Sequence, residues 1–177
     1  MKIHATLDLE TLDVMSTATV LSIGGVKFNP YNDSDPYDKF YHKVCIEDQD
    51  KLGRTTSDKT LEWWGTQDPA IMEEALDQTG ALTVVQLLAA LNKWLVGTDT
   101  LWGQGYGFDY NILENMYRSV ETPTPWNFWQ IRDSRTLFSL LREDPRKKMQ
   151  TDPHNAYADA YYQSKAIQIA YKELGLQ

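Results

Sequence analysis

The sequence predicts an α/β domain in which three strands come first and a mixture of helices and strand follows. Two observations predict it. Apolar side chains recur at every second position near the N-terminus, as in half-buried strands, whereas after about residue 60 they recur every three or four positions, as on amphipathic helices. This order of elements is typical of α/β domains. The 177 residues fit one domain by size, so we expect a single domain over residues 1–177.

The N-terminal quarter of the chain predicts three strands. Residues 3–10 alternate apolar and more polar side chains, which predicts the first strand. Residues 17–28 are rich in Val, Ile and Thr, and Gly24 and Gly25 interrupt them, which predicts a second strand with a bulge or a close approach of another element. Residues 29–36 form a turn, and residues 40–46 predict a third strand. The short connections favour an antiparallel arrangement.

Helical patterns dominate the remaining sequence. Two short helices are predicted at 60–65 and 69–76, and a longer amphipathic helix at 84–95. A short strand is expected at 100–102, followed by a glycine-containing loop at 103–107 and a helix at 109–120. Residues 121–129 contain two prolines and are expected to be irregular, whereas helical patterns return at 136–142 and 155–174.

Composition points to a cellular location but does not decide which ligand the chain binds. Cys45 is the only cysteine, the N-terminus lacks the apolar core of a signal peptide, and no apolar run approaches the ~20 residues that span a bilayer. We therefore expect a soluble, cytoplasmic protein with no membrane segment. The net charge of −8 argues against extensive phosphate contacts. Carboxylates are also the ligands of divalent cations, which reverse the local charge, so net charge alone does not decide.

Asp8 and Glu10 are two positions apart on the first predicted strand, so both side chains point to the same face. Two neighbouring carboxylates repel each other, and a divalent cation relieves that repulsion. This pattern is consistent with a metal site, although it also occurs on ordinary solvent-facing strands.

Asp109 shares a helix face with the apolar residues that follow it, Ile112, Leu113, Met116 and Val120. A carboxylate directed at a core is costly unless it is paired or bound to metal. The alternative is an N-cap, a position that Asp favours at the start of a helix.

His154 lies five residues before Asp159. Pro153 disfavours helix at the residue before it, so the last helix is expected to start near residue 154 or 155. Asp159 would then lie inside the helix and His154 at its entrance, where a histidine can accept a proton from water near neutral pH. A surface histidine before a helix is the alternative.

Taken in order, these residues resemble the motifs of the DEDDh (DnaQ-like) superfamily of 3′→5′ exonucleases. The D-x-E-T motif matches residues 8–11, the aromatic-aspartate pair matches Phe108 and Asp109, and the His-x4-Asp motif matches His154 and Asp159. The flanking residues at 60–64, 102–105, 132–137 and 154–156 resemble the group that contains phage exonuclease A and bacterial 3′→5′ exoribonucleases. The resemblance extends over nearly the whole chain.

The resemblance implies a ribonuclease-H-like fold, a mixed sheet with its first three strands antiparallel and helices around it. It also implies hydrolysis of single-stranded RNA or DNA from the 3′ end, with release of nucleoside 5′-monophosphates. Asp8, Glu10, Asp109 and Asp159 would hold two Mg²⁺ or Mn²⁺ ions, and His154 would act as general base.

Five residues are predicted to contact the substrate: Thr11, Leu12, Trp63, Trp64 and Phe108. Stacking of an aromatic side chain contributes ~1–3 kcal/mol per base. Adjacent tryptophans cannot both face the same way, so one of Trp63 and Trp64 is expected to contact substrate, and packing in a short helix is the alternative for either. Leu12 would contact the terminal base, with ordinary packing as the competing role.

Other interpretations stay open at this point. The chain could act on short or modified nucleotides with the same metals, or could be an inactive relative that binds nucleic acid. The basic residues Arg142, Arg146, Lys147 and Lys148 would guide a strand towards the metals or form a solvated loop. Related enzymes are often dimers, which leaves a homodimer as an expectation.

Overall fold

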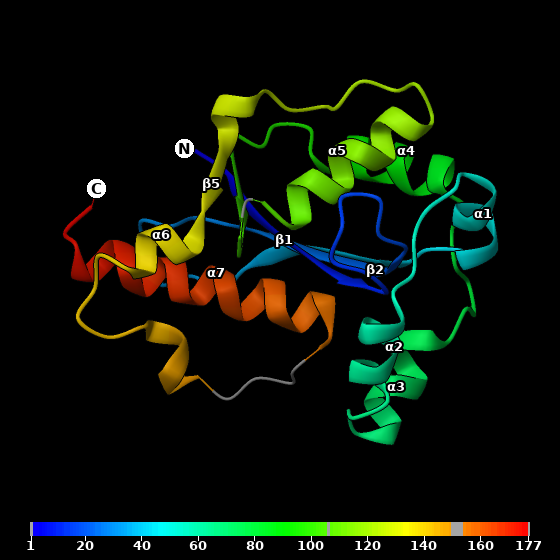
Figure 1. Cartoon of the computed structure of the whole chain (residues 1–177). Coiled ribbons are helices and arrows are strands. Elements are labelled where there is room, and N and C mark those ends of the chain that lie inside the picture. The colour runs from blue at the N-terminus through cyan, green and yellow to red at the C-terminus, as the bar shows by residue number, and fades with distance from the viewer. Residues whose placement is uncertain (1, 106, 150–153, 177) are drawn as a thin grey trace.

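A five-stranded mixed sheet forms the centre of the computed structural model, which describes residues 2–105, 107–149 and 154–176 (Figure 1). The strands have the spatial order β3-β2-β1-β4-β5. β1 pairs antiparallel with β2, β2 pairs antiparallel with β3, and β4 and β5 run parallel to β1. Their bounds are His4–Thr11, Val20–Phe28, Tyr37–Lys43, Thr100–Gly103 and Ile131–Asp133. The predicted α/β class and the antiparallel first three strands are confirmed.

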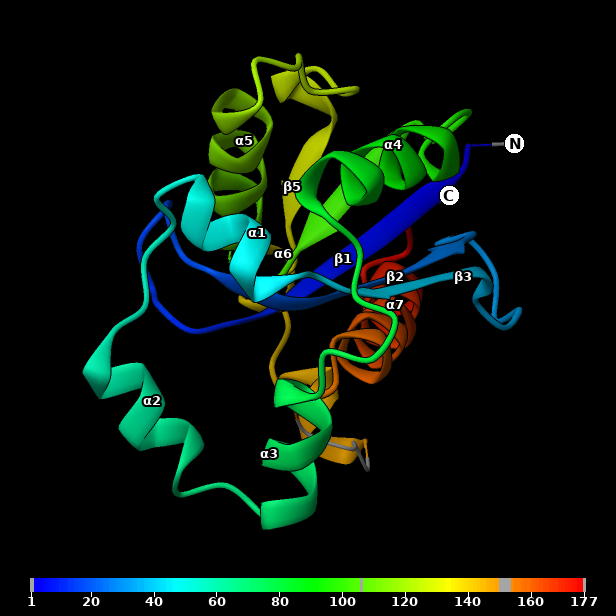
Figure 2. The same cartoon turned by 90° about the vertical axis from the view of Figure 1, so that its right-hand side faces the viewer.

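Helices cover both faces of the sheet. α4 and α5 lie on one face and α7 lies on the other, whereas α2 and α3 extend beyond one end of the strands (Figures 1 and 2). The helices α1 to α7 are Ile46–Lys51, Asp58–Trp64, Pro69–Leu76, Val84–Trp94, Asp109–Ser119, Ser134–Phe138 and Ala156–Glu173. Short 3-10 turns are Phe128–Gln130 and Pro145–Lys148. None of the helices in the described part of the chain is long and apolar enough to cross a membrane.

Four short elements differ from the prediction. The third strand is Tyr37–Lys43 rather than 40–46, and the unpredicted helix α1 begins at Ile46, where the buried Gln49 side chain bonds both backbone groups of Val20 at 2.8 Å. Strand β5 was not predicted because three residues are too few to show an alternation. Helix α6 begins at Ser134 because the Asp133 carboxylate accepts hydrogen bonds from the first free backbone N–H groups.

The alternation along β1 separates the core from a second, more polar face. Ala5, Leu7 and Leu9 belong to the main apolar cluster, together with side chains of α4 and α5. Thr6 lies on the opposite face, where its hydroxyl donates a 2.8 Å hydrogen bond to the Ala160 carbonyl of α7. Asp8 and Glu10 follow on that same face, because side chains two apart on a strand point the same way.

Helix α7 rests directly on the backbone of β2 at Gly24. A Cβ atom added to Gly24 would lie 2.1 Å from the carbonyl carbon of Ala156 and 2.2 Å from the nitrogen of Tyr157. Gly24 is also the strand partner of Asp8. The predicted close approach is therefore present, and a register shift between Gly25 and Lys27 adds the predicted irregularity. The absence of a side chain at Gly24 places the N-terminal turn of α7 next to the middle of β1.

We expect Gly24→Ala to destabilise the fold by about 1–3 kcal/mol or more, because the added methyl group meets backbone atoms that cannot rotate away. Chemical denaturation measures this loss. Gly107→Ala is the matched control, since the nearest atom to its added Cβ is 4.0 Å away, and we expect a change below about 1 kcal/mol. Equal stability of Gly24→Ala and Gly107→Ala would show that α7 does not need this contact.

Candidate active site

Two elements bring three carboxyl groups together. Asp8 and Glu10 come from β1, and Asp159 comes from the start of α7. One oxygen atom from each lies within 4.8 Å of the others. The contact at Gly24 determines this arrangement, because it sets the height of α7 over the strand that carries Asp8 and Glu10.

The end of β1 is shaped by a β-bulge. The register with β2 shifts between Glu10 and Thr11, and bulges of this kind redirect the neighbouring side chains. The indole Nε1 of the buried Trp64 donates a 2.9 Å hydrogen bond to the Thr11 carbonyl. This bond ties α2 to the end of the strand that carries the carboxylates.

Asp109 supplies a fourth carboxyl group from the start of α5. It is 3% exposed and is the first residue of the helix, whereas Phe108 occupies the N-cap. The alternative that Asp109 is the N-cap of this helix is therefore wrong, because Phe108 occupies that position. The backbone N–H of Leu9 hydrogen-bonds its carboxylate, which links α5 to β1 beside Asp8.

Burial and mutual repulsion keep these carboxyl groups from ionising together. Burial raises the pKa of Glu10 to about 8, and the charges of Asp159 and Asp109 add to the effect. Burial also raises the pKa of Asp109 to about 7, against the opposing effect of the Leu9 N–H. The pKa of Asp8 lies well above its ordinary value, first through burial and then through Asp109 and Glu10. Burial raises the pKa of Asp159 as well.

His154 lies at the rim of this cluster. Its backbone N–H donates a 3.1 Å hydrogen bond to Oδ2 of Asp159, and Asn155 caps α7 by accepting from the Ala158 N–H. The imidazole lies edge-on to Trp63, with ring centroids 4.8 Å apart and planes at 90°. Pro153, which was predicted to set the start of this helix, lies outside the described residues.

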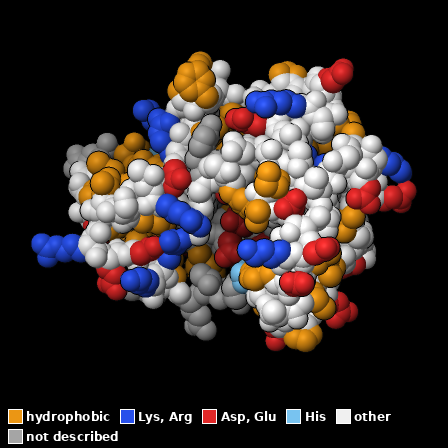
Figure 3. Space-filling view, in the orientation of Figure 1, with side chains coloured by type: hydrophobic (Ala, Val, Ile, Leu, Met, Phe, Trp, Pro, Cys, Tyr) orange, Lys and Arg blue, Asp and Glu red, His pale blue; other side chains and the backbone are white. Residues whose placement is uncertain are grey.

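Glu10 and Asp159 line pockets at the surface, whereas Asp109 is buried beneath it. Figure 3 shows a hollow in this surface, with acidic side chains at its base, a histidine at its edge and basic side chains on both sides. A pocket of about 410 Å³ opens beside Glu10 and has mostly apolar walls. A second pocket of about 430 Å³ opens beside Asp159, and its lining includes Arg146 and Lys147.

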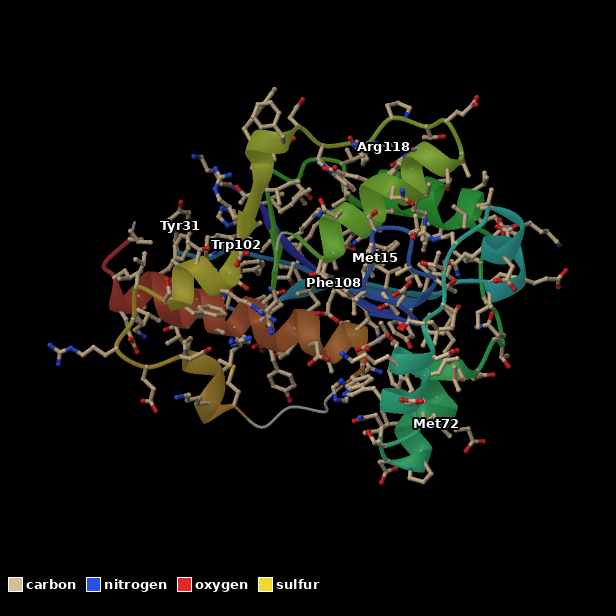
Figure 4. All side chains as sticks on the ribbon, in the orientation of Figure 1. Met15, Tyr31, Met72, Trp102, Phe108 and Arg118 are labelled. Atoms are coloured by element: carbon tan, nitrogen blue, oxygen red, sulfur yellow. The ribbon has the colours of Figure 1, made fainter. Side chains whose placement is uncertain are left out.

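The apolar pocket contains four of the five predicted substrate contacts: Thr11, Trp63, Trp64 and Phe108. Figure 4 shows Phe108 at the start of α5, above the central strands. Trp63 is 42% exposed whereas Trp64 is 1% exposed, so Trp63 is the tryptophan that a ligand can reach. Leu12 is outside the lining and packs in a buried cluster with Leu21, Trp64 and Ala75. Its packing role is present, and its contact with substrate stays a prediction.

Some other residues that line the apolar pocket were not predicted. They are Val14, from the loop after β1, and Ser57, Lys59 and Thr60, from the region of α2. Ser57, Lys59 and Thr60 lie close to the tryptophan pair in the sequence, and Thr60 belongs to the segment 60–64 that carries the resemblance, whereas nothing in the sequence pointed to Val14. Gln163 lines the second pocket, and its spacing of four from Asp159 on α7 would have predicted the shared face.

Residues 3–171 match the family described as the 3'-5' exoribonuclease Rv2179c-like domain. The chain belongs to this family. The resemblance to the DEDDh exonucleases is thereby confirmed, and the match covers all four acidic residues and His154. No sequence among the curated proteins matches the chain.

Solved structures show that this Rv2179c-like domain has the fold of the DEDDh exonucleases. The nuclease domain of 3'hExo, a DEDDh family member bound to rAMP, matches with a TM-score of 0.63 at 17% identity, over 99% of this chain and 94% of that one. Exonuclease I from Methylocaldum szegediense matches with a TM-score of 0.66 at 13% identity, over 98% of this chain and 41% of that one. A zinc-bound complex of E. coli exonuclease I with single-stranded DNA matches with a TM-score of 0.65 at 12% identity, over 99% and 42%. The chain therefore spans less than half the length of the exonuclease I proteins.

The raised carboxyl pKa values predict that the metal-free domain loses stability as pH rises. Glu10 holds its proton in the folded state up to about pH 8 and ionises near pH 4.5 when unfolded, so the unfolded state binds fewer protons between these values. We expect the melting temperature in EDTA to fall from pH 5 to pH 8, and Glu10→Gln to flatten this fall.

The matched control is Glu73→Gln, which removes an exposed carboxylate on α3 and the same formal charge. Thermal melts across pH compare the three proteins. If Glu10→Gln follows the same pH profile as Glu73→Gln, the carboxyl cluster is not under the inferred repulsion.

Proposed function

We propose that this Rv2179c-like domain is a metal-dependent 3′→5′ exonuclease, with one catalytic domain over residues 1–177. It hydrolyses the terminal phosphodiester of a single strand and releases a nucleoside 5′-monophosphate. The observation that carries the proposal is the meeting of Asp8, Glu10 and Asp159 beside Asp109 and His154, next to an apolar pocket. Family membership supports the same reaction class.

The donor set is suited to divalent cations, and two of them are proposed. Four carboxyl groups with raised pKa values converge, and positive charge is the compensation that would let them ionise together. Asp8, Glu10, Asp109 and Asp159 would be the ligands, and oxygen ligands favour Mg²⁺ or Mn²⁺. When bound, such ions would supply Lewis-acid stabilisation of phosphoryl oxygens and lower the pKa of water. The zinc seen in the E. coli relative belongs to that protein, and here the donor set offers no thiolate.

His154 would take the proton of the attacking water. Its position between the Asp159 carboxylate and the rim of the hollow supports this role. A positioned general base contributes typically 10²–10⁴-fold to a rate. The hydrogen bond from the His154 backbone N–H to Asp159 would hold the base close to one of the proposed metal ligands.

The two pockets suggest how a strand lies across the site. The apolar pocket beside Glu10 would receive the terminal base, with the exposed Trp63 as its stacking surface. The preceding nucleotide would lie towards the second pocket, where Lys147 is exposed. Arg146 is partly neutralised by Asp144, whose carboxylate lies 2.5 Å from its guanidinium. The DNA strand in the E. coli relative and the rAMP in the 3'hExo structure leave both RNA and DNA as substrates to test.

We expect a 5′-labelled single strand to shorten stepwise from its 3′ end in Mg²⁺ or Mn²⁺, with no cleavage in EDTA. RNA and DNA of the same sequence reveal the preferred sugar. Asp8→Asn should abolish the ladder because it removes a ligand charge, and His154→Ala should lower kcat by about 10²–10⁴-fold. His42→Ala, on β3, is the matched control and should retain activity.

Absence of cleavage of both polymers in either metal would contradict the exonuclease proposal. Hydrolysis of dinucleotides or nucleotide diesters alone would then assign the site to short substrates.

Lys147 should contribute to binding through charge. We expect Lys147→Ala to raise KM several-fold with little change in kcat, and to reduce the slope of log KM against log salt by about 0.7, the value for one lost phosphate contact on a single strand. Lys51→Ala on α1 is the control, because Lys51 pairs with Glu47 away from the hollow. Identical salt slopes for both variants would place the strand elsewhere.

A further inference from the structure

Trp63 contacts two parts of the candidate site at once. Its side chain lines the apolar pocket, and its ring centroid lies 4.8 Å from that of His154 at an interplanar angle of 90°. We propose that Trp63 is a positioning residue for the His154 imidazole, so that the ring that stacks on the terminal base also holds the general base. This inference rests on the function proposed above.

Helix α2 holds the Trp63 ring in a fixed place relative to β1. The neighbouring Trp64 is 1% exposed and packs with Leu12 and Leu21. Its indole Nε1 donates to the Thr11 carbonyl, and its ring lies 5.0 Å from Trp63 in an edge-to-face arrangement. The strand that carries Glu10 therefore also fixes the aromatic pair.

The backbone and the ring of His154 are held by different elements. The backbone is tied to α7 through Asp159, and it has a φ of 65°, which few residues other than glycine adopt. Within the described residues, the imidazole has ring contacts with Trp63 and Trp64, at 4.8 and 6.2 Å, and no hydrogen bond. The ring contacts of the imidazole are therefore with α2, although His154 itself directly precedes α7 and its charge also acts on Asp159.

Two roles of one ring have separate kinetic signatures. Stacking of the terminal base stabilises the ground state and the transition state alike, so its loss raises KM. Positioning of the general base acts on the chemical step, so its loss lowers kcat. A side chain with stacking alone would leave kcat unchanged when it is removed.

A double-mutant cycle tests the coupling between Trp63 and His154. We expect Trp63→Leu to lower kcat about 10-fold in the otherwise unchanged protein, and less than about 2-fold in a His154→Ala background, because the base is then already absent. The KM increase should be the same in both backgrounds. Trp63→Phe should restore most of kcat, since it retains an aromatic face. Leu61→Ala, another exposed residue of α2, should leave kcat unchanged.

Proton NMR of the histidines gives a readout without metal or substrate. The chain has three histidines, so the imidazole resonances can be assigned by single substitution. We expect Trp63→Leu to shift the His154 ring protons, and Leu61→Ala to leave them in place, with His4 and His42 unaffected in both variants.

Equal kcat losses for Trp63→Leu in the two backgrounds, or His154 resonances that do not respond to Trp63→Leu, would overturn the positioning role while the exonuclease proposal stands. An inactive unmodified protein would instead overturn the exonuclease proposal, and the positioning role with it.

Discussion

The contact between α7 and the backbone of Gly24 is the constraint on which the rest of the candidate site depends. Asp159 reaches the β1 carboxylates because no side chain separates the helix from the sheet at this point. The hydroxyl of Thr6 reinforces the contact two residues before Asp8, through the Ala160 carbonyl. One backbone approach thus sets the distance between the two chain segments that supply acidic groups from opposite ends of the sequence.

The close packing of α7 on the sheet has an electrostatic cost, because it brings carboxyl groups together. A Glu10 pKa of about 8 corresponds to on the order of 5 kcal/mol of unfavourable free energy when that carboxyl is forced to ionise in the folded state. Apolar packing on the other face of β1 offsets the cost, since Ala5, Leu7 and Leu9 are almost fully buried there. One face of β1 therefore stabilises the fold through apolar packing, and the other face carries carboxyl groups that repel each other. Bound cations would convert the repulsion into favourable coordination, which links metal binding to stability in the proposed function.

The sequence predicted the long elements and the acidic residues for physical reasons that are visible in the structure. The alternation in β1 and the apolar stripes of α4 and α5 are local patterns that tertiary packing preserves. Strand β5 was missed because three residues are too few to display a period, and helix α1 was missed because Ile46 is its only apolar side chain, which leaves no apolar stripe. The N-cap alternative for Asp109 failed because the Leu9 N–H, a partner distant in sequence, binds its carboxylate. Pocket residues such as Lys59 come together through chain folding alone, so no local pattern marks them.

In the proposed function, an acidic chain binds a polyanionic substrate because the charge at the binding site differs from the net charge. The net charge of −8 belongs to the whole chain, whereas the substrate would meet only the hollow and its rim, where Figure 3 shows basic as well as acidic side chains. There, aromatic stacking at Trp63 needs no charge, and Lys147 lies on the side away from it. Cations bound at the carboxylates would reverse the sign at the point where the scissile phosphate lies. The acidic surface beyond this rim would repel a strand, so binding would depend on the metals and on a few basic side chains such as Lys147.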